Sequence, residues 1–323
     1  MPDRVKNSSF EIADMLVKPG TKATGELPLV KLVTGNQISI PLYIFNGYEP
    51  GPVIWISAAI HGDEVAGVEI IRQVIEKINP KKLRGTLITV PIVNVHGFLN
   101  RERYLPDRRD LNRSFPGSAK GSLAAGIAHL FMSEIVSRCD MGIDLHTGSN
   151  NRANYPQIRS DLDNPESKRL CEVFGAPIML HSKIRDGSLR GAASERGKKV
   201  LLYEGGEANR FDYEAIRYAV NGIMRILADQ GMTDTFTEPN EMQSLESRNS
   251  SWLRAKKSGI AIMGSELGEF INKGQTMGLI HNSLGKQLGR IIAHSSGLII
   301  GRSMQPLVNQ GDALYHIAEV NGE

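Results

Sequence analysis

An apolar run that ends in a histidine and a glutamate constrains the fold of this chain more than any other stretch. The run, Val53–Ile60, has the length of a buried strand, and His61 and Glu64 follow it directly. Apolar residues at helical spacing then continue to Ile78. Because Gly62 permits a sharp turn, we expect a strand, a turn and a helix, with both polar side chains at the carboxyl end of the strand. Alone, this pair is more often found on an ordinary surface than at a metal.

Strand and helix patterns alternate along the rest of the first two thirds of the chain. This alternation predicts an α/β domain whose mixed, mainly parallel sheet is flanked by helices. The strongest further strand patterns lie at 86–94, 141–146 and 199–204, and the strongest helical patterns lie at 123–136 and 211–228. Polar composition predicts an extended lead-in at 1–23 and long loops at 95–121 and 147–165.

Two more of the predicted strands end in residues that can hold a metal or move a proton. His146 ends one of them and Glu204 ends the other. The carboxyl ends of parallel strands meet at one edge, so His61, Glu64 and His146 should gather there. Two histidines and one glutamate with an open position form the ligand set of a hydrolytic zinc site. We therefore predict one Zn²⁺ per chain, with Glu204 as the base that takes a proton from water.

The long loop predicted over 95–121 carries closely spaced arginines. Arginines in such a loop could bind a substrate carboxylate or stabilise an oxyanion that forms during the reaction. The alternative is a solvated loop with ordinary surface arginines. The loop arginines are Arg101, Arg103, Arg108, Arg109 and Arg113.

The composition changes near residue 231. Residues 233–251 are polar and resemble a linker, and 252–323 combine frequent glycines with short apolar pieces, which predicts a small all-β module. We expect a catalytic domain over 1–240 and a C-terminal β domain over 250–323.

Composition excludes several classes of protein. Of the 323 residues, 41% are hydrophobic and 23% charged, and the net charge is only +3, which is typical of a soluble globular protein without a nucleic-acid or membrane surface. Cys139 and Cys171 have neither metal spacing nor the density of a secreted scaffold, so free thiols are expected. The N-terminus lacks a signal-peptide pattern, and a cytoplasmic location is the expectation.

Four motifs occur in order along the chain: His61-Gly62-Asp63-Glu64, Asp110-Leu111-Asn112-Arg113, Asp144-Leu145-His146 and Tyr203-Glu204-Gly205-Gly206. Together they resemble the succinylglutamate desuccinylase/aspartoacylase family, which belongs to the wider zinc carboxypeptidase fold. The C-terminal module also resembles half of a lipoyl/biotinyl-type barrel, and this implies a barrel-sandwich-like domain.

The resemblance implies roles for the residues in these motifs. It makes His61, Glu64 and His146 the zinc ligands and Glu204 the general base and acid. It makes Asp110 the partner that orients His61.

The same resemblance implies a substrate carboxylate held by Asn112 and Arg113, and a scissile carbonyl polarised by Arg103. The loop is longer here than in the aspartoacylases, so Arg101, Arg108 and Arg109 remain alternatives to Arg103. Arg190 is a weaker substrate-binding candidate. Other residues have weaker claims still: Glu207 as a rival of Glu204, His96 and His181 as site residues, Lys286 as a cofactor arm, and Asp63 as a turn residue without a further role.

We expect a zinc-dependent hydrolase that cleaves the amide bond of a small N-acyl amino acid or related carboxylate. The alternatives are a zinc carboxypeptidase or amidase acting on small peptides, and a non-catalytic protein that binds small carboxylates. The partner is a small molecule in each case, and a homo-oligomer is compatible with the sequence.

Overall fold

The computed structural model of the chain describes residues 5–234, 236 and 243–320. The helices are α1 (Ala66–Lys77), α2 (Val95–Asn100), α3 (Leu123–Glu134), α4 (Pro165–Phe174), α5 (Leu189–Ser194) and α6 (Tyr213–Asp229), with short 3₁₀ helices η1 (Leu111–Arg113) and η2 (Val136–Arg138). The strands before α6 are β1 (Phe10–Ile12), β2 (Met15–Val17), β3 (Thr21–Lys31), β4 (Gln37–Asn46), β5 (Glu49–Ala58), β6 (Arg84–Val90), β7 (Met141–Gly148), β8 (Arg152–Ser160), β9 (Ile178–His181) and β10 (Lys199–Glu207). The later strands are β11 (Leu245–Arg254), β12 (Gly259–Met263), β13 (Phe270–Ile271), β14 (Thr276–His281), β15 (Gln287–Ile292), β16 (Gly297–Ser303), β17 (Leu307–Val308) and β18 (Ala313–Val320).

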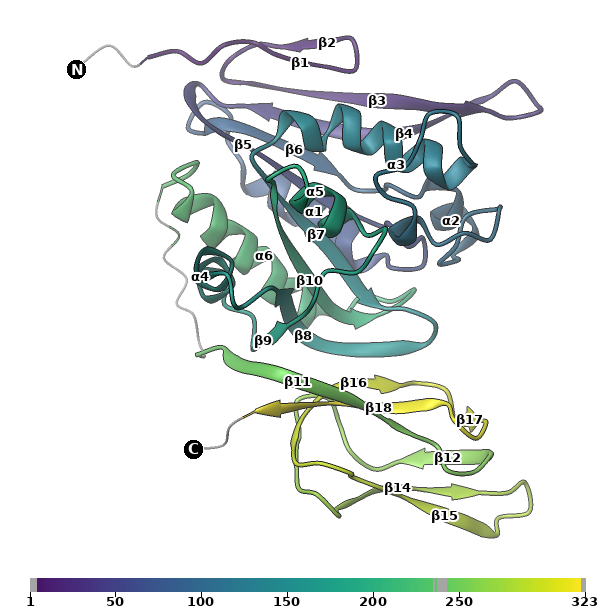
Figure 1. The fold of residues 1–323 in the computed structure, drawn as a ribbon. Coiled ribbons are helices and arrows are strands. Elements are labelled where there is room, and N and C mark those ends of the chain that lie inside the picture. Colours follow the sequence, from purple (N-terminus) through teal and green to yellow (C-terminus); the bar gives the residue numbers. More distant parts are fainter. Residues whose placement is uncertain (1–4, 235, 237–242, 321–323) are drawn as a thin grey trace.

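One large mixed sheet organises the described residues (Figure 1). Its strand order is β13-β16-β18-β11-β9-β8-β10-β7-β5-β6-β4-β3. The central strands β6, β5, β7 and β10 are parallel neighbours, whereas β4 and β8 run antiparallel to them. The predicted α/β class is confirmed, but the prediction of a mainly parallel sheet holds only for the central strands and for the neighbours of β9.

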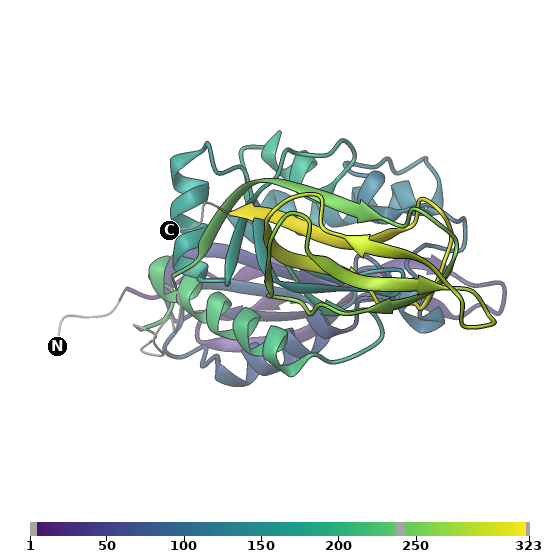
Figure 2. The same cartoon turned by 90° about the horizontal axis from the view of Figure 1, so that it is seen from below.

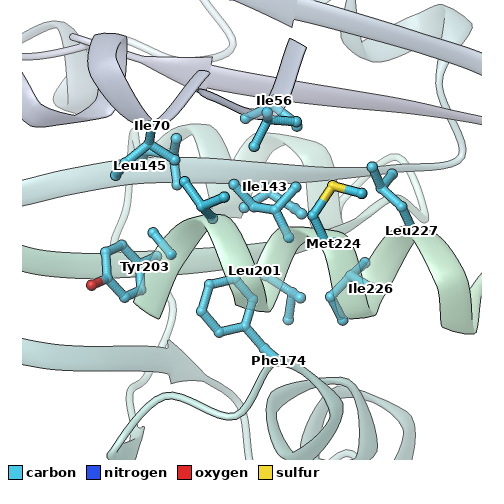
Figure 3. Close-up of a cluster of buried hydrophobic side chains, with 14 of the residues drawn as sticks. Ile56, Ile70, Ile143, Leu145, Phe174, Leu201, Tyr203, Met224, Ile226 and Leu227 are labelled. Atoms are coloured by element: carbon cyan, nitrogen blue, oxygen red, sulfur yellow. The ribbon is translucent and has the colours of Figure 1, made fainter. Parts of the chain in front are cut away.

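The sheet separates two hydrophobic cores because its central strands are apolar on both faces. In β5, Ile54 and Ile56 belong to the core beneath α1, α4 and α6, while Trp55 between them belongs to the core beneath α3 and α5. Figure 3 shows the first core, where Ile56 and Leu145 face the side chains of α6. The strand ends that carry the polar residues are therefore held by close packing on both sides.

Strand β8 corrects the prediction of a long loop over 147–165. Only a few of its side chains are apolar, yet Asn154, Gln157 and Ser160 are buried. They are polar because this strand faces a cavity and pairs with a strand of the C-terminal segment. A strand with a buried polar face lacks the apolar alternation by which strands are predicted.

Two other segments are more regular than predicted. The loop over 95–121 begins with α2 and contains η1, and the lead-in over 1–23 contains the β1–β2 hairpin and the start of β3. The lead-in is anchored by Asn46, which is fully buried. The Asn46 amide donates to the carbonyls of Ser8 at 2.9 Å and Val17 at 2.8 Å, and its oxygen accepts from Thr86 at 3.1 Å.

The C-terminal segment is all-β in its described part, as predicted for 252–323. Strands β15, β14, β12 and β17 form a separate sheet, whereas β11, β18, β16 and β13 extend the large sheet. Figure 2, seen from below, shows these yellow-green strands lying across the end of the α/β part. The predicted linker over 233–251 is therefore strand from Leu245 onwards, and its residues 235 and 237–242 lie outside the described part. The division at 240–250 stays a prediction, since strand pairing continues across it.

None of the described helices is both long and apolar enough to cross a membrane.

Replacing Asn46 by alanine should lower the free energy of unfolding by about 2–3 kcal/mol, because the buried carbonyl of Val17 and the partly buried carbonyl of Ser8 lose their donor. Denaturant unfolding of Asn46→Ala measures the change. Asn36→Ala is the matched control, since Asn36 is exposed in the β3–β4 turn and should change stability by less than about 0.5 kcal/mol. Equal stability of the two variants would show that the lead-in is not anchored in this way.

Candidate active site

The turn after β5 brings His61 and Glu64 to one point. Ala59 has a φ of 50°, and the backbone N–H of Glu64 donates to the carbonyl of His61 at 3.1 Å. Gly62 lies so close to the start of α2 that a Cβ would be 1.9 Å from the carbonyl carbon of Gly97. The glycine is therefore required by close backbone approach, which fixes where the turn can go.

The Glu64 carboxylate bridges the two histidines. Its Oε1 lies 2.7 Å from His61 Nδ1, and its Oε2 lies 2.7 Å from His146 Nδ1. The three side chains are buried, and they offer ligand atoms that all lie within 4.8 Å of one another. The sequence predicted that these residues meet, and the structure brings them together.

The opposite nitrogen of each imidazole faces a second carboxylate. His61 Nε2 lies 3.2 Å from Asp110 Oδ1, and His146 Nε2 lies 2.8 Å from Asp144 Oδ2. Asp144 is itself held by the Ser57 hydroxyl, which donates to it at 2.9 Å. Carboxylates at these positions fix the ring orientation and leave both Nδ1 atoms for a cation. Asp144 had no predicted role, although the Asp-x-His spacing was visible.

The protonation of the group follows from its charges. Burial lowers the pKa of both histidines, but the carboxylates of Glu64, Asp110 and Asp144 outweigh this and raise the pKa of His61 and, more strongly, of His146. Burial raises the pKa of Glu64, and the two imidazoles reverse this to leave it far below its usual range. The donor set fits a divalent cation, which would replace the imidazole protons, because a ligating histidine must be neutral.

A cavity of about 450 Å³ opens beside this group. Glu204 lines it, and its register partner in β7 is His146, so the two residues lie side by side at the ends of parallel strands. The Glu204 carboxylate accepts from Asn154 at 2.6 Å and pairs with Arg159 at 3.2 Å. Glu207, the rival candidate, does not line the cavity and pairs with Arg210 at 3.6 Å.

Asn112 and Arg113 reach the same cavity from η1. The Asp110 side chain starts this turn by accepting from the backbone N–H of Asn112 at 2.9 Å. Asn112 is buried, and its side-chain oxygen accepts from the backbone N–H of Leu189 at 2.9 Å. Because this oxygen already accepts a hydrogen bond, the side-chain nitrogen of Asn112 is the atom that can donate to a ligand.

Comparisons with known proteins identify the family of this chain. The family model for the succinylglutamate desuccinylase/aspartoacylase catalytic domain matches residues 50–229 of the sequence. The chain belongs to the succinylglutamate desuccinylase/aspartoacylase family. A relative in this family, the N-alpha-acetyl-L-2,4-diaminobutyric acid deacetylase of Halomonas elongata, is 27% identical over 298 residues, which cover 88% of this chain and 87% of the relative.

Solved structures share the family fold. A succinylglutamate desuccinylase/aspartoacylase from Rhodobacter sphaeroides superposes with a TM-score of 0.82 at 24% identity, covering 93% of this chain and 96% of that one. The product-bound ectoine utilization protein EutE (DoeB) from Ruegeria pomeroyi gives a TM-score of 0.83 at 23% identity, covering 92% and 95%. The predicted zinc carboxypeptidase-like family fold is thereby confirmed.

We call the group of His61, Glu64 and His146 the histidine group. Among the candidate arginines of the 95–121 loop, Arg103 lies beside this group. It lines the cavity and pairs with Asp110 at 2.9 Å, whereas Arg101 and Arg108 line only a second cavity, which Arg103 also reaches. Arg109 is exposed beside Asp107. Arg190 lines the cavity, but its guanidinium donates to the carbonyls of Arg159, Ser182 and Lys183.

The remaining candidates supply no ligand atom to the group of His61, Glu64 and His146. His181 lines the cavity, but its Nδ1 accepts from the backbone of Leu162 at 3.2 Å. His96 does not line the cavity, and Lys286 is exposed in a turn. Asp63, left without a role, is buried and accepts from the Ser149 hydroxyl at 2.9 Å.

Sequence reasoning missed the wall that the C-terminal segment supplies. Trp252 of β11 and His316 of β18 line the cavity and stack with ring centroids 4.6 Å apart. Arg152 of β8 lies over the same tryptophan, 5.4 Å from its ring centroid. No local motif marks these residues, because they reach the site only through strand pairing between distant segments.

Purified protein should contain about one zinc ion per chain, and His146→Ala should lose it, because one of three ligands is removed. Elemental analysis of metal-reconstituted, dialysed protein measures this. His129→Ala, an exposed change on α3, is the matched control and should keep its zinc. Stoichiometric zinc in His146→Ala, or none in the wild type, would contradict the assignment.

Proposed function

We propose that this protein is a zinc-dependent deacylase that hydrolyses the amide bond of a small N-acyl amino acid or a related carboxylate. The observation that carries the proposal is one cavity lined by the His61, Glu64 and His146 group, by Glu204, and by Arg113. The deacetylase activity named for the relative from Halomonas elongata belongs to the same class of reaction.

The histidine group and Glu204 divide the chemistry between them. Zinc, when bound by the three ligands, supplies a water of lowered pKa and polarises the scissile carbonyl. Glu204 takes a proton from the attacking water, whose oxygen bonds to the carbonyl carbon. It then gives the proton to the amide nitrogen as the carbon–nitrogen bond breaks, which leaves a carboxylate and an amine.

Arg103 would donate to the oxyanion that forms on the carbonyl oxygen. Its guanidinium is held in place by Asp110 at 2.9 Å and by Glu64 at 3.5 Å, so it needs no reorganisation during the reaction. Asn112 and Arg113 would hold the substrate carboxylate, for which the planar guanidinium fork is suited.

The cavity also favours a second negative charge on the substrate. Arg152 and Arg185 line it, and neither has a carboxylate partner within ion-pair distance among the described residues. Burial and the charges of Arg159 and Arg185 lower the pKa of His316 to about 3, so this wall is positively charged while the imidazole is neutral. An acidic acyl group or amino-acid side chain would complement that wall.

The same wall argues against the peptidase alternative. Trp252 and His316 close the side of a cavity of about 450 Å³, a volume that suits a metabolite-sized ligand rather than an extended peptide.

Glu204→Gln tests the proposal on a panel of N-acetyl and N-succinyl amino acids with the zinc-loaded protein. The wild type should hydrolyse some of them, and Glu204→Gln should lower kcat by about 10²–10⁴-fold, because the amide cannot accept the proton. Glu207→Gln is the matched control and should retain wild-type turnover. Full activity of Glu204→Gln would instead support a site without this base, and an inactive wild type would favour the binding-protein alternative.

Arg152→Gln and Arg185→Gln should lower kcat/KM about 10–100-fold for substrates with a second carboxylate, since a charge-assisted hydrogen bond is lost. Singly charged substrates should change by less than about 3-fold, because no such bond is lost with them. Arg290→Gln, an exposed change on β15, is the control. Equal losses for both kinds of substrate would exclude the second anionic subsite.

A further inference from the structure

In the part of the chain that the structure describes, the Glu204 carboxylate is held through one oxygen, Oε2. Asn154 Nδ2 donates to Oε2 at 2.6 Å, and Arg159 pairs with the same oxygen at 3.2 Å. Oε1 takes part in neither contact. Both holding residues come from β8, the antiparallel neighbour of β10, so the position of β8 decides where this carboxylate points.

Arg159 is held in turn by Gln157, which is fully buried. The Arg159 Nε donates to Gln157 Oε1 at 3.2 Å. The Gln157 amide donates to the carbonyl of Ile300 in β16 at 3.0 Å, and to that of Tyr155 at 3.1 Å. Two hydrogen bonds and the Arg159–Glu204 ion pair therefore connect the backbone of the C-terminal segment to Glu204.

Asn154 meets the same strand at a second point. It is the register partner of Gly301 in β16, and a Cβ on Gly301 would lie 3.1 Å from the Asn154 side-chain oxygen. That distance is tighter than ordinary van der Waals contact, so a methyl group there would press on the amide that holds Glu204.

We infer that the C-terminal segment positions the general base, acting from β16 through Gln157 and Arg159 and through Asn154 packed against Gly301. Gln157 and Asn154 are positioning residues in this arrangement and touch Glu204 or its holder rather than the reacting atoms. The inference rests on the proposed function, because it assigns Glu204 the proton transfer.

The physical argument is one of placement. A general base must lie within hydrogen-bond reach of the proton it removes, and a misplacement of about 1 Å can cost about 100-fold in rate. Both contacts fall on Oε2, so their loss would free the carboxylate to rotate about its side-chain bonds. The side chains proposed above to hydrogen-bond the substrate do not include Gln157, Asn154 or Arg159, so the effect should fall on kcat.

A double-mutant cycle between Gln157 and Glu204 tests this. Gln157→Met keeps the length of the side chain and removes both of its hydrogen-bonding groups. It should lower kcat about 10–100-fold while KM changes less than about 3-fold and the zinc content is unchanged. In the Glu204→Gln background, the same change should have no further effect on kcat, because the base on which it acts is gone.

Gly301→Ala tests the second contact from outside the cavity. It should lower kcat about 3–10-fold through the Asn154 amide, again only when Glu204 is present. Gly289→Ala in β15 is the matched control, because a Cβ there meets nothing within 4 Å, and it should leave kcat unchanged. If Gln157→Met fails to fold, the Gly301 cycle decides alone.

The outcomes separate the two claims. Equal falls in kcat with and without Glu204, or a rise in KM or a loss of zinc as large as the fall in kcat, overturn the positioning role and leave the proposed function standing. Unchanged turnover in Glu204→Gln overturns the proposed function and this inference with it.

Discussion

The bridge that the Glu64 carboxylate makes between two imidazoles is the contact on which the site depends. It joins the turn after β5 to the end of β7, with both nitrogen–oxygen distances at 2.7 Å. Burying a carboxylate without partners is costly, so this position is stable only with positive charge beside it. The two imidazoles beside it raise the positive charge when they are protonated, and a divalent cation bound by the same three side chains would supply that charge in their place.

The outer carboxylates complete the arrangement. Asp110 and Asp144 turn each ring so that Nδ1 faces Glu64, and Ser57 holds Asp144 from the neighbouring strand. The groups to which we assign the reaction therefore come from strand ends, or from the turn after one, held between two cores. The residues proposed to contact the substrate come from other elements, among them β8 and η1, and so lie outside the cation group.

Prediction from the sequence succeeded where the chemistry coincides with apolar strands. His61, His146 and Glu204 follow continuous apolar runs, so their approach at one sheet edge could be inferred. It failed where polar residues are buried, as in β8, because Asn154 and Gln157 satisfy their hydrogen bonds through partners that lie 50 and 143 residues away. The wall of Trp252 and His316 also could not be inferred, since it depends on the pairing of β16 with β8.

X-ray absorption spectroscopy at the zinc edge of the reconstituted protein tests the central claim most directly. The account predicts two imidazole nitrogens at about 2.0–2.1 Å with the other ligands oxygen at about 2.0–2.2 Å. It also predicts the loss of one imidazole shell in a variant that lacks His61. A sulfur shell at about 2.3 Å, or a spectrum unchanged by that substitution, would contradict it.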